Sequence, residues 1–114
     1  MKKLTDLNLS SAQKRALTEL RQRLAEEFAI SEVILFGSVA RGEGDEESDI
    51  DLLLLTEKPL TRIERHQITD MVFEVNLQHN TNFSTLVVDQ NSWKSGTISI
   101  LPIRGEILKD GVPL

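Results

Sequence analysis

The chain has 114 residues, a length that fits one domain. Its 13 basic and 18 acidic residues give a net charge of −5, which argues against a surface designed mainly to neutralise nucleic-acid phosphates. Cysteine is absent, which excludes disulfides and thiolate zinc sites and leaves hard cations such as Mg²⁺ as the favoured metals. No apolar run approaches the roughly 20 residues that a membrane span needs. We therefore expect a soluble cytoplasmic protein.

The first half of the chain predicts a helix, a strand, a short turn and a second strand. Leucines recur at helical spacing over residues 11–29, and Ser10 with Gln13 forms a capping box where that pattern begins. Residues 33–36 are an apolar run that predicts a buried strand. After a polar loop, residues 50–55 predict a second strand whose leucines indicate that both faces are covered.

The second half continues with a helix and a strand. Thr61 and Glu64 form another capping box, which predicts a helix that reaches about residue 79. Residues 83–88 predict a third strand, and 103–109 a last short helix, whereas 90–102 show no clear pattern. This order predicts an α/β (α+β) domain, a small sheet flanked by helices. We expect a single domain over 1–114, with a core of about 11–89 and a C-terminal appendage, 90–114.

The segment that carries chemistry runs from the end of the first predicted strand to the start of the second. Gly37 and Ser38 end a strand and start a helical turn, where a glycine permits close approach and backbone N–H groups favour a phosphate. Asp49 and Asp51 are two residues apart on a strand, so their carboxylates share one face. These carboxylates repel unless a cation lies between them, and Mg²⁺ bound by carboxylates and substrate phosphates relieves the repulsion. The segment therefore predicts a metal–nucleotide site.

Other polar and aromatic residues have plainer interpretations. Residues 45–47 are an acidic run that we interpret as a solvated loop and exclude from the site. His66 and His79 have no ligand-spaced partner, so surface histidines are the favoured interpretation. Trp93 is expected to pack within the C-terminal appendage, and a base-stacking platform is the alternative that the sequence leaves open. Arg41 either contacts phosphate or lies on the surface of the turn, and the sequence leaves both open.

A family resemblance follows from the two half-motifs taken together. Gly37-Ser38, ten intervening residues and then Asp49-Ile50-Asp51 resembles the G-S-x₁₀-D-x-D signature of minimal nucleotidyltransferases in the DNA polymerase β superfamily. The resemblance implies the polymerase β-like fold with a mixed three-stranded sheet. It also implies that Gly37 and Ser38 bind the triphosphate, with Arg41 as a further candidate nucleotide-binding residue. Asp49 and Asp51 would be the catalytic residues and the ligands of one or two Mg²⁺ ions. The exact motif covers residues 37–52.

The chain departs from that family at one position. Active members usually place a third carboxylate on the next core strand, whereas residues 83–88 contain no acid and Ser84 occupies the expected position. Asp89 and Glu74 are the nearest alternatives in the sequence. A missing ligand should weaken the metal that activates the nucleophile more than the metal that holds the triphosphate. Nucleotide binding is therefore less affected than catalysis.

The resemblance extends to a class of function. Minimal domains of this kind resemble the antitoxin half of two-gene bacterial modules whose other half is a helical HEPN ribonuclease. The implied reaction is transfer of AMP from ATP to a tyrosine hydroxyl of that partner. The alternative is a catalytically silent antitoxin or regulatory subunit that binds nucleotide or a partner. A third function, AMP transfer to a small molecule, would require a further domain for the acceptor. The nucleotide base, the acceptor and the oligomeric state stay open.

Overall fold

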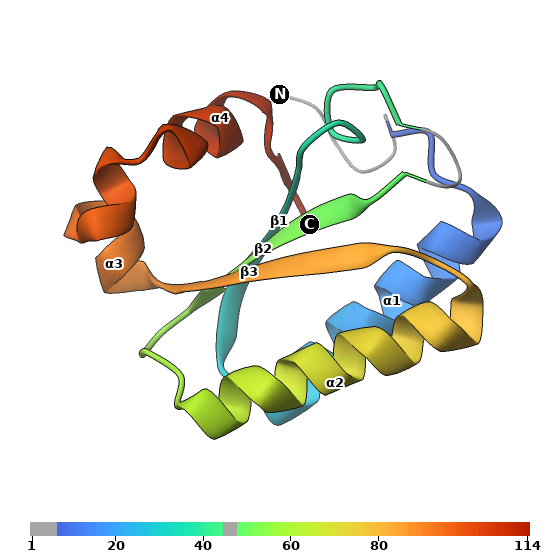
Figure 1. The fold of residues 1–114 in the computed structure, drawn as a ribbon, viewed down its shortest axis with the longest axis horizontal. Coiled ribbons are helices and arrows are strands. Elements are labelled where there is room, and N and C mark those ends of the chain that lie inside the picture. Colours follow the sequence, from blue (N-terminus) through green and yellow to red (C-terminus); the bar gives the residue numbers. More distant parts are fainter. Residues whose placement is uncertain (1–6, 45–47) are drawn as a thin grey trace.

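The computed structural model describes residues 7–44 and 48–114. Its helices are α1 (Ser11–Glu27), α2 (Arg62–His79), α3 (Gln90–Ser95) and α4 (Pro102–Asp110), with a 3₁₀ helix at Thr97–Ile100. Its strands are β1 (Ile30–Phe36), β2 (Ile50–Thr56), β3 (Phe83–Asp89) and β4 (Val112–Pro113), as Figure 1 shows. The predicted α/β class is confirmed. The acidic run at 45–47 lies outside the described residues.

The strands form one mixed sheet in the order β3-β2-β1-β4. Strand β1 is antiparallel to both β2 and β4, and β2 is parallel to β3. The prediction of three strands was one short, because Val112 of the C-terminal segment pairs with Leu35 of β1. A two-residue strand is too short to show a period-2 pattern, and Pro113 is a residue that sheets accept only at an edge.

Both predicted capping boxes are present. At the start of α1, the Ser10 hydroxyl accepts a hydrogen bond from the Gln13 amide at 3.1 Å, and the Gln13 side chain accepts one from the Ser10 amide at 2.8 Å. Thr61 and Glu64 repeat this exchange at the start of α2. Each exchange satisfies two backbone donors that the first turn of a helix leaves unpaired. Both long helices therefore begin where the sequence predicts.

The alternation along β2 divides the core into two layers. Leu52 and Leu54 belong to a large cluster with α1 and α2, whereas Leu53 and Leu55 belong to a smaller one on the other face. Figure 1 shows α1 and α2 together on one side of the sheet, and α3 and α4 on the other. All four leucines are at most 1% exposed, which confirms the predicted two-sided burial. Burying each one contributes about 1.5–3 kcal/mol.

Residues 90–102, for which the sequence predicts no element, fold into α3 and the 3₁₀ helix. Asp89 caps α3, because its carboxylate accepts hydrogen bonds from the Ser92 amide at 3.0 Å and the Ser92 hydroxyl at 2.7 Å. Trp93 is buried in the smaller cluster, which confirms its predicted packing role. The Arg104 guanidinium lies 5.4 Å from the centre of the Trp93 ring, and its Nε donates to the Trp93 carbonyl at 2.8 Å. Six residues are too few for a helical period to be visible in the sequence.

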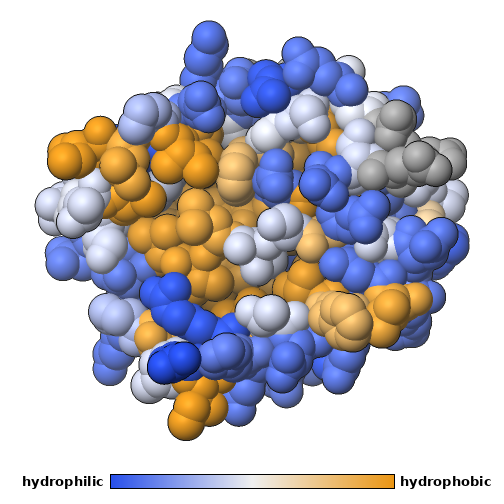
Figure 2. Space-filling model, in the orientation of Figure 1, coloured by the Kyte–Doolittle hydropathy of each residue, from blue (hydrophilic) through white to orange (hydrophobic). Residues whose placement is uncertain are grey.

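The surface on the α3 and α4 side carries more apolar area than the rest of the view in Figure 2. Large exposed apolar side chains there are Ile100, Leu101 and Leu108. A second exposed set lies on α2 and consists of Ile63, Phe73 and Leu77. No helix formed by the described residues has the length and apolar character needed to cross a bilayer.

Candidate functional site

The turn after β1 is built by Gly37 and hydrogen bonds that follow it. Gly37 has a φ of 83°, a left-handed conformation that favours glycine. The Arg41 amide donates to the carbonyls of Gly37 at 3.2 Å and Ser38 at 3.1 Å, and the Glu43 amide donates to the Ser38 carbonyl at 2.9 Å. The predicted helical turn is thus a single turn, and no regular helix follows it before residue 44.

Gly37 also makes room for a carboxylate. The β1–β2 register places Asp51 opposite Phe36, the residue immediately before Gly37. A Cβ atom added at Gly37 would lie 2.3 Å from Oδ2 of Asp51, far inside any allowed contact. The sequence prediction explained this glycine by the close approach of a phosphate. In the structure, the group that comes close is the Asp51 carboxylate, so the turn and the acid form one unit.

The two motif carboxylates influence one another. Ile50 between them is fully buried in the larger cluster, which directs its neighbours along the strand to the opposite face. Burial raises the pKa of Asp51 above its usual value, the negative charge of Asp49 raises it further, and the positive charge of Arg41 partly offsets both. A raised pKa means that ionised Asp51 is unfavourable without a positive partner. A bound cation would supply that partner.

A cavity of about 340 Å³ opens between the turn, β2 and α4. Its lining consists of Phe36, Gly37, Ser38, Arg41, Asp51 and Glu106. Four predicted site residues are thus brought together, while Asp49 stays exposed outside the lining. Glu106 was not predicted, because it lies on α4 and reaches the cavity only through tertiary packing. No local pattern in the sequence identifies it.

Arg41 lines the cavity and also has a partner. Its Nε lies 3.2 Å from Oε2 of Glu43, and the two side chains are 41% and 64% exposed. An ion pair this exposed contributes about 0–1 kcal/mol. A phosphate oxygen in the cavity could therefore replace Glu43 at small cost, so the pairing is compatible with either interpretation of Arg41.

The donor groups fit Mg²⁺ shared with a substrate. In residues 7–44 and 48–114, no group of three or more acidic or histidine side chains is arranged to hold a metal ion. A fully protein-ligated metal centre is thus not formed by this part of the chain. Mg²⁺ usually takes one or two carboxylates and completes its shell with water and phosphate oxygens. Asp49 and Asp51 meet that requirement.

The acids considered as replacements for the missing third carboxylate lie elsewhere. The β2–β3 register pairs Ser84 with Asp51, so the position beside Asp51 indeed carries a hydroxyl. Asp89 pairs with Thr56 at the far end of β3 and caps α3. Its hydrogen bonds from the Ser92 hydroxyl and amide lower the pKa of Asp89. Glu74 is on α2, on the opposite face of the sheet, where it pairs with Arg23 at 2.9 Å.

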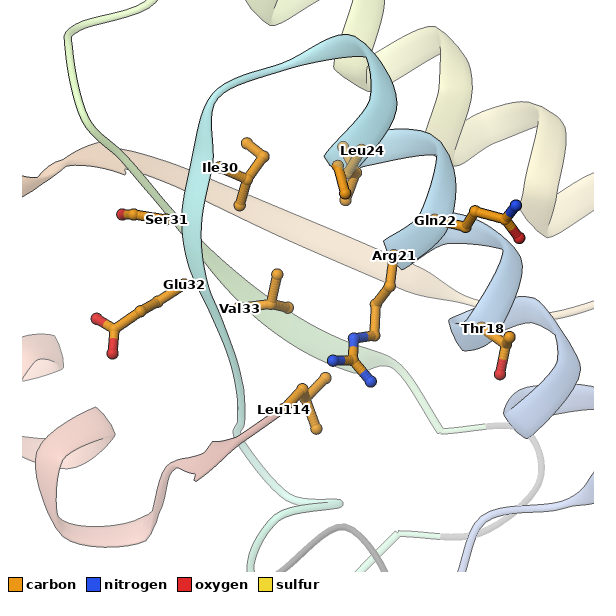
Figure 3. Close-up of a pocket in the computed structure, with 10 residues that line it drawn as sticks. Thr18, Arg21, Gln22, Leu24, Ile30, Ser31, Glu32, Val33 and Leu114 are labelled. Atoms are coloured by element: carbon orange, nitrogen blue, oxygen red, sulfur yellow. The ribbon is translucent and has the colours of Figure 1, made fainter.

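A separate hollow of about 420 Å³ lies between α1 and β1 (Figure 3). Its lining includes Leu24 and Val33, and Figure 3 shows the Arg21 side chain directed toward Leu114. None of the motif residues lines it. His79 is also engaged away from the motif, at 3.4 Å from Glu19, while His66 is exposed. The candidate site is therefore the cavity at Asp51.

Comparison with known proteins matches the chain to a family by its sequence and to solved structures by its fold. The family described as "Nucleotidyltransferase domain" matches residues 17–109. A relative from Methanocaldococcus jannaschii, named "Putative protein adenylyltransferase MJ1305", is 38% identical over 77 residues, which is 64% of this chain and 52% of the relative. A second relative from that organism carries the same description and is 38% identical over 58 residues, 51% of this chain and 59% of its own length. The chain thus spans little more than half of either.

Two solved structures share the fold. One, described as a "putative nucleotidyltransferase" from Sulfolobus solfataricus, has a TM-score of 0.55 and 25% identity, covering 87% of this chain and 76% of that one. Another, described as a toxin–antitoxin with AMP-PNP, has a TM-score of 0.58 and 19% identity, covering 88% and 70%. At that identity the second shows the fold alone. With a family match over most of its length and four of its five predicted site residues at one cavity, this chain belongs to the nucleotidyltransferase domain family.

Proposed function

We propose that the chain transfers AMP from ATP to a hydroxyl group on a partner protein, with Mg²⁺ bound by Asp49 and Asp51. The observation that carries this proposal is the unit of Gly37 and Asp51, in which the turn after β1 and a half-buried carboxylate line one cavity. The family match supports nucleotidyl transfer as the reaction. The cytoplasm, which supplies ATP, is the proposed location.

The triphosphate would be held by the turn and by Arg41. Backbone N–H groups and the Ser38 hydroxyl are donors suited to phosphate oxygens, and Arg41 adds a positive charge at the same cavity. Mg²⁺ bound by Asp49 and Asp51 would neutralise charge on the triphosphate and on the leaving group. The acceptor oxygen attacks the α-phosphorus in line, the bond from that phosphorus to the bridging oxygen breaks, and pyrophosphate leaves.

The acceptor is proposed to be a protein, a helical HEPN-type toxin in a two-component module. Three observations support this. The relatives from Methanocaldococcus jannaschii are named as protein adenylyltransferases. The fold is shared with toxin–antitoxin complexes, one of them with AMP-PNP. Exposed apolar residues of the C-terminal segment, Ile100, Leu101 and Leu108, form a surface of the kind that proteins use to bind one another.

The test is incubation of the protein with α-labelled ATP, Mg²⁺ and the product of the neighbouring gene. We expect label on the partner, lost when Mg²⁺ is chelated and in the Asp49→Asn, Asp51→Asn double variant. ATP labelled on the γ-phosphate should leave the partner unlabelled, because the reaction retains only the α-phosphate. Label from γ-labelled ATP would indicate a kinase and contradict the proposal.

A second candidate, a binding subunit without chemistry, is favoured by one observation: a hydroxyl, Ser84, stands beside Asp51. The same incubation decides between the two. Tight binding of ATP and of the partner without any transfer of label would support the silent subunit.

A further inference from the structure

We propose that Glu106 accepts the proton of the attacking hydroxyl, so that α4 supplies the catalytic carboxylate that β3 lacks. This inference deepens the proposed function and rests on it. Among the acidic side chains of residues 7–44 and 48–114, Asp51 and Glu106 line the cavity. Asp51 is assigned to the metal, which leaves Glu106 as the carboxylate in the cavity that can take a proton.

The helical phase of α4 explains how Glu106 reaches the cavity. Ile107 is 2% exposed and packs in the smaller cluster, and Ile103, four residues earlier, packs against the same cluster. Residues at this spacing share one face of a helix. Glu106 lies one turn after Ile103 and one residue before Ile107, which places it on the flank of the face directed at the sheet. Figure 1 shows α4 beside the turn that follows β1.

The C-terminal end of α4 is fixed to β1 at close range. The Gly111 amide donates to the Ile107 carbonyl at 2.7 Å, and the next residue, Val112, pairs with Leu35 in the sheet. A Cβ atom at Gly111 would lie 2.4 Å from the Ile107 carbonyl oxygen and 2.8 Å from Cγ2 of Ile34. The helix and the strand can approach this closely because residue 111 is glycine. The end of α4 is therefore held against β1, and this fixes the position of Glu106 on that helix.

Proton transfer, rather than metal binding, is the role that fits this position. Asp49, Asp51 and Glu106 do not form a three-acid group arranged for a metal in the described part of the chain. In the reaction, the acceptor O–H bond breaks as the new oxygen–phosphorus bond forms, and pyrophosphate departs with the electrons of the broken P–O bond. The released proton goes to the Glu106 carboxylate, and then to water. A general base must lie within hydrogen-bond distance of the acceptor hydroxyl, and it does not need to contact the metal.

The first test is Glu106→Gln, with Asp110→Asn as the matched control. Asp110 is an acid on the same helix, one turn later, and is not among the cavity-lining residues. Loss of a general base should lower transfer by about 10²–10⁴-fold. The affinity for Mg²⁺·ATP, measured by calorimetry, should stay unchanged, and so should transfer by Asp110→Asn.

A second test needs no catalysis. Since the chain contains no cysteine, a single introduced cysteine is the sole target of a thiol reagent. Mg²⁺ with a non-hydrolysable ATP analogue should slow alkylation of the Glu106→Cys variant and leave that of Asp110→Cys unchanged. Equal alkylation rates with and without the analogue at position 106, when calorimetry shows the analogue bound, would overturn the placement of Glu106 at the nucleotide.

The outcomes separate the two proposals. Transfer by Glu106→Gln at the unmodified rate overturns the inference and leaves the proposed function standing. A loss of transfer matched by an equal loss of Mg²⁺·ATP affinity also overturns it, because Glu106 would then be a ligand-binding group. If the unmodified chain binds ATP but transfers nothing, there is no proton for Glu106 to accept and the inference fails. If the unmodified chain binds no ATP, the proposed function fails first.

Discussion

Gly37 has no side chain at the point where the Asp51 carboxylate meets the turn after β1, and its φ of 83° is left-handed. We predict that Gly37→Ala abolishes Mg²⁺·ATP binding, because the new Cβ would displace the Asp51 carboxylate. Gly42→Ala is the matched control, since Gly42 also has a left-handed φ, 79°, yet nothing lies within 4 Å of its Cβ position. Left-handed strain alone costs about 1–2 kcal/mol in either variant. Calorimetry measures ATP binding and thermal unfolding measures stability, so the two methods together separate the clash with Asp51 from the backbone strain. An equal loss of ATP binding in both variants would contradict the clash as the cause.

Asp51 is predicted to destabilise the metal-free domain at neutral pH. Burial raises its pKa in the folded state, and the charge of Asp49 adds to the shift. The folded chain therefore binds the proton more tightly than the unfolded chain does. By linkage, stability is greatest below the ordinary pKa of the carboxyl and falls as pH rises through the raised value.

Asp51→Asn removes this dependence, so the variant should be more stable than the unmodified protein at neutral pH without metal, and less different from it in acid. Urea unfolding in the presence of a chelator, at acidic and at neutral pH, measures this. Addition of Mg²⁺ and ATP should reverse the order, because a ligand stabilises only the form that binds it. A variant less stable than the unmodified chain in chelator at neutral pH would contradict the assignment.

At the level of elements, Gly105 within α4 and Gly111 at its C-cap differ in what surrounds them. Nothing lies within 4 Å of a Cβ at Gly105, in the interior of the helix, whereas a Cβ at Gly111 would collide with the Ile107 carbonyl and with Ile34. We predict that Gly105→Ala stabilises the protein by about 0.5–1 kcal/mol, the usual gain in a helix interior. Gly111→Ala should shift α4 away from β1 and lower AMP transfer while nucleotide affinity is kept. Denaturant unfolding measures the stability of both variants, and labelled ATP measures their AMP transfer. Equal changes of stability and of transfer in the two variants would contradict the prediction.

The elements that the sequence predicted are those with a local signature. Ser10–Gln13 and Thr61–Glu64 fix the starts of α1 and α2, because a capping box is a pattern of only four residues. The run of leucines in β2 predicted a strand that is buried on both faces. In contrast, α3 and β4 are too short for a period to be visible, and β4 exists because β1 offers it a free edge. Their recognition requires the assembled sheet.

The same distinction applies to the site. Gly37, Ser38, Arg41 and Asp51 line one cavity as the motif led us to expect, since the turn starts directly after Phe36, which pairs with Asp51 in the sheet. Their assigned roles remain predictions. Glu106 could not be anticipated, because it comes from a helix that only tertiary packing brings to the cavity. Conversely, Asp89 seemed a candidate in the sequence and is a helix cap in the structure.

Across the whole molecule, the two exposed apolar sets lie on opposite faces of the sheet. Leu108 is 60% exposed on the α4 side, which also holds the cavity, and Leu77 is 69% exposed on α2. A protein acceptor must present its hydroxyl at the cavity, so we predict that it docks on the α4 side. Leu108→Asp should lower transfer to the partner and keep Mg²⁺·ATP affinity, whereas Leu77→Asp should change neither. Pull-down and labelled transfer measure this; the reverse pattern would place the partner on α2.

The central claim is that the cavity at Gly37 and Asp51 binds a metal–triphosphate complex. Titration calorimetry of the unmodified protein with ATP, with Mg²⁺ and then with chelator, tests it most directly, and the Asp49→Asn, Asp51→Asn double variant is the matched comparison. We predict one ATP bound per chain with Mg²⁺, and loss of that binding both in chelator and in the double variant. ATP binding of equal affinity under all three conditions would contradict the claim and place the nucleotide elsewhere on the molecule.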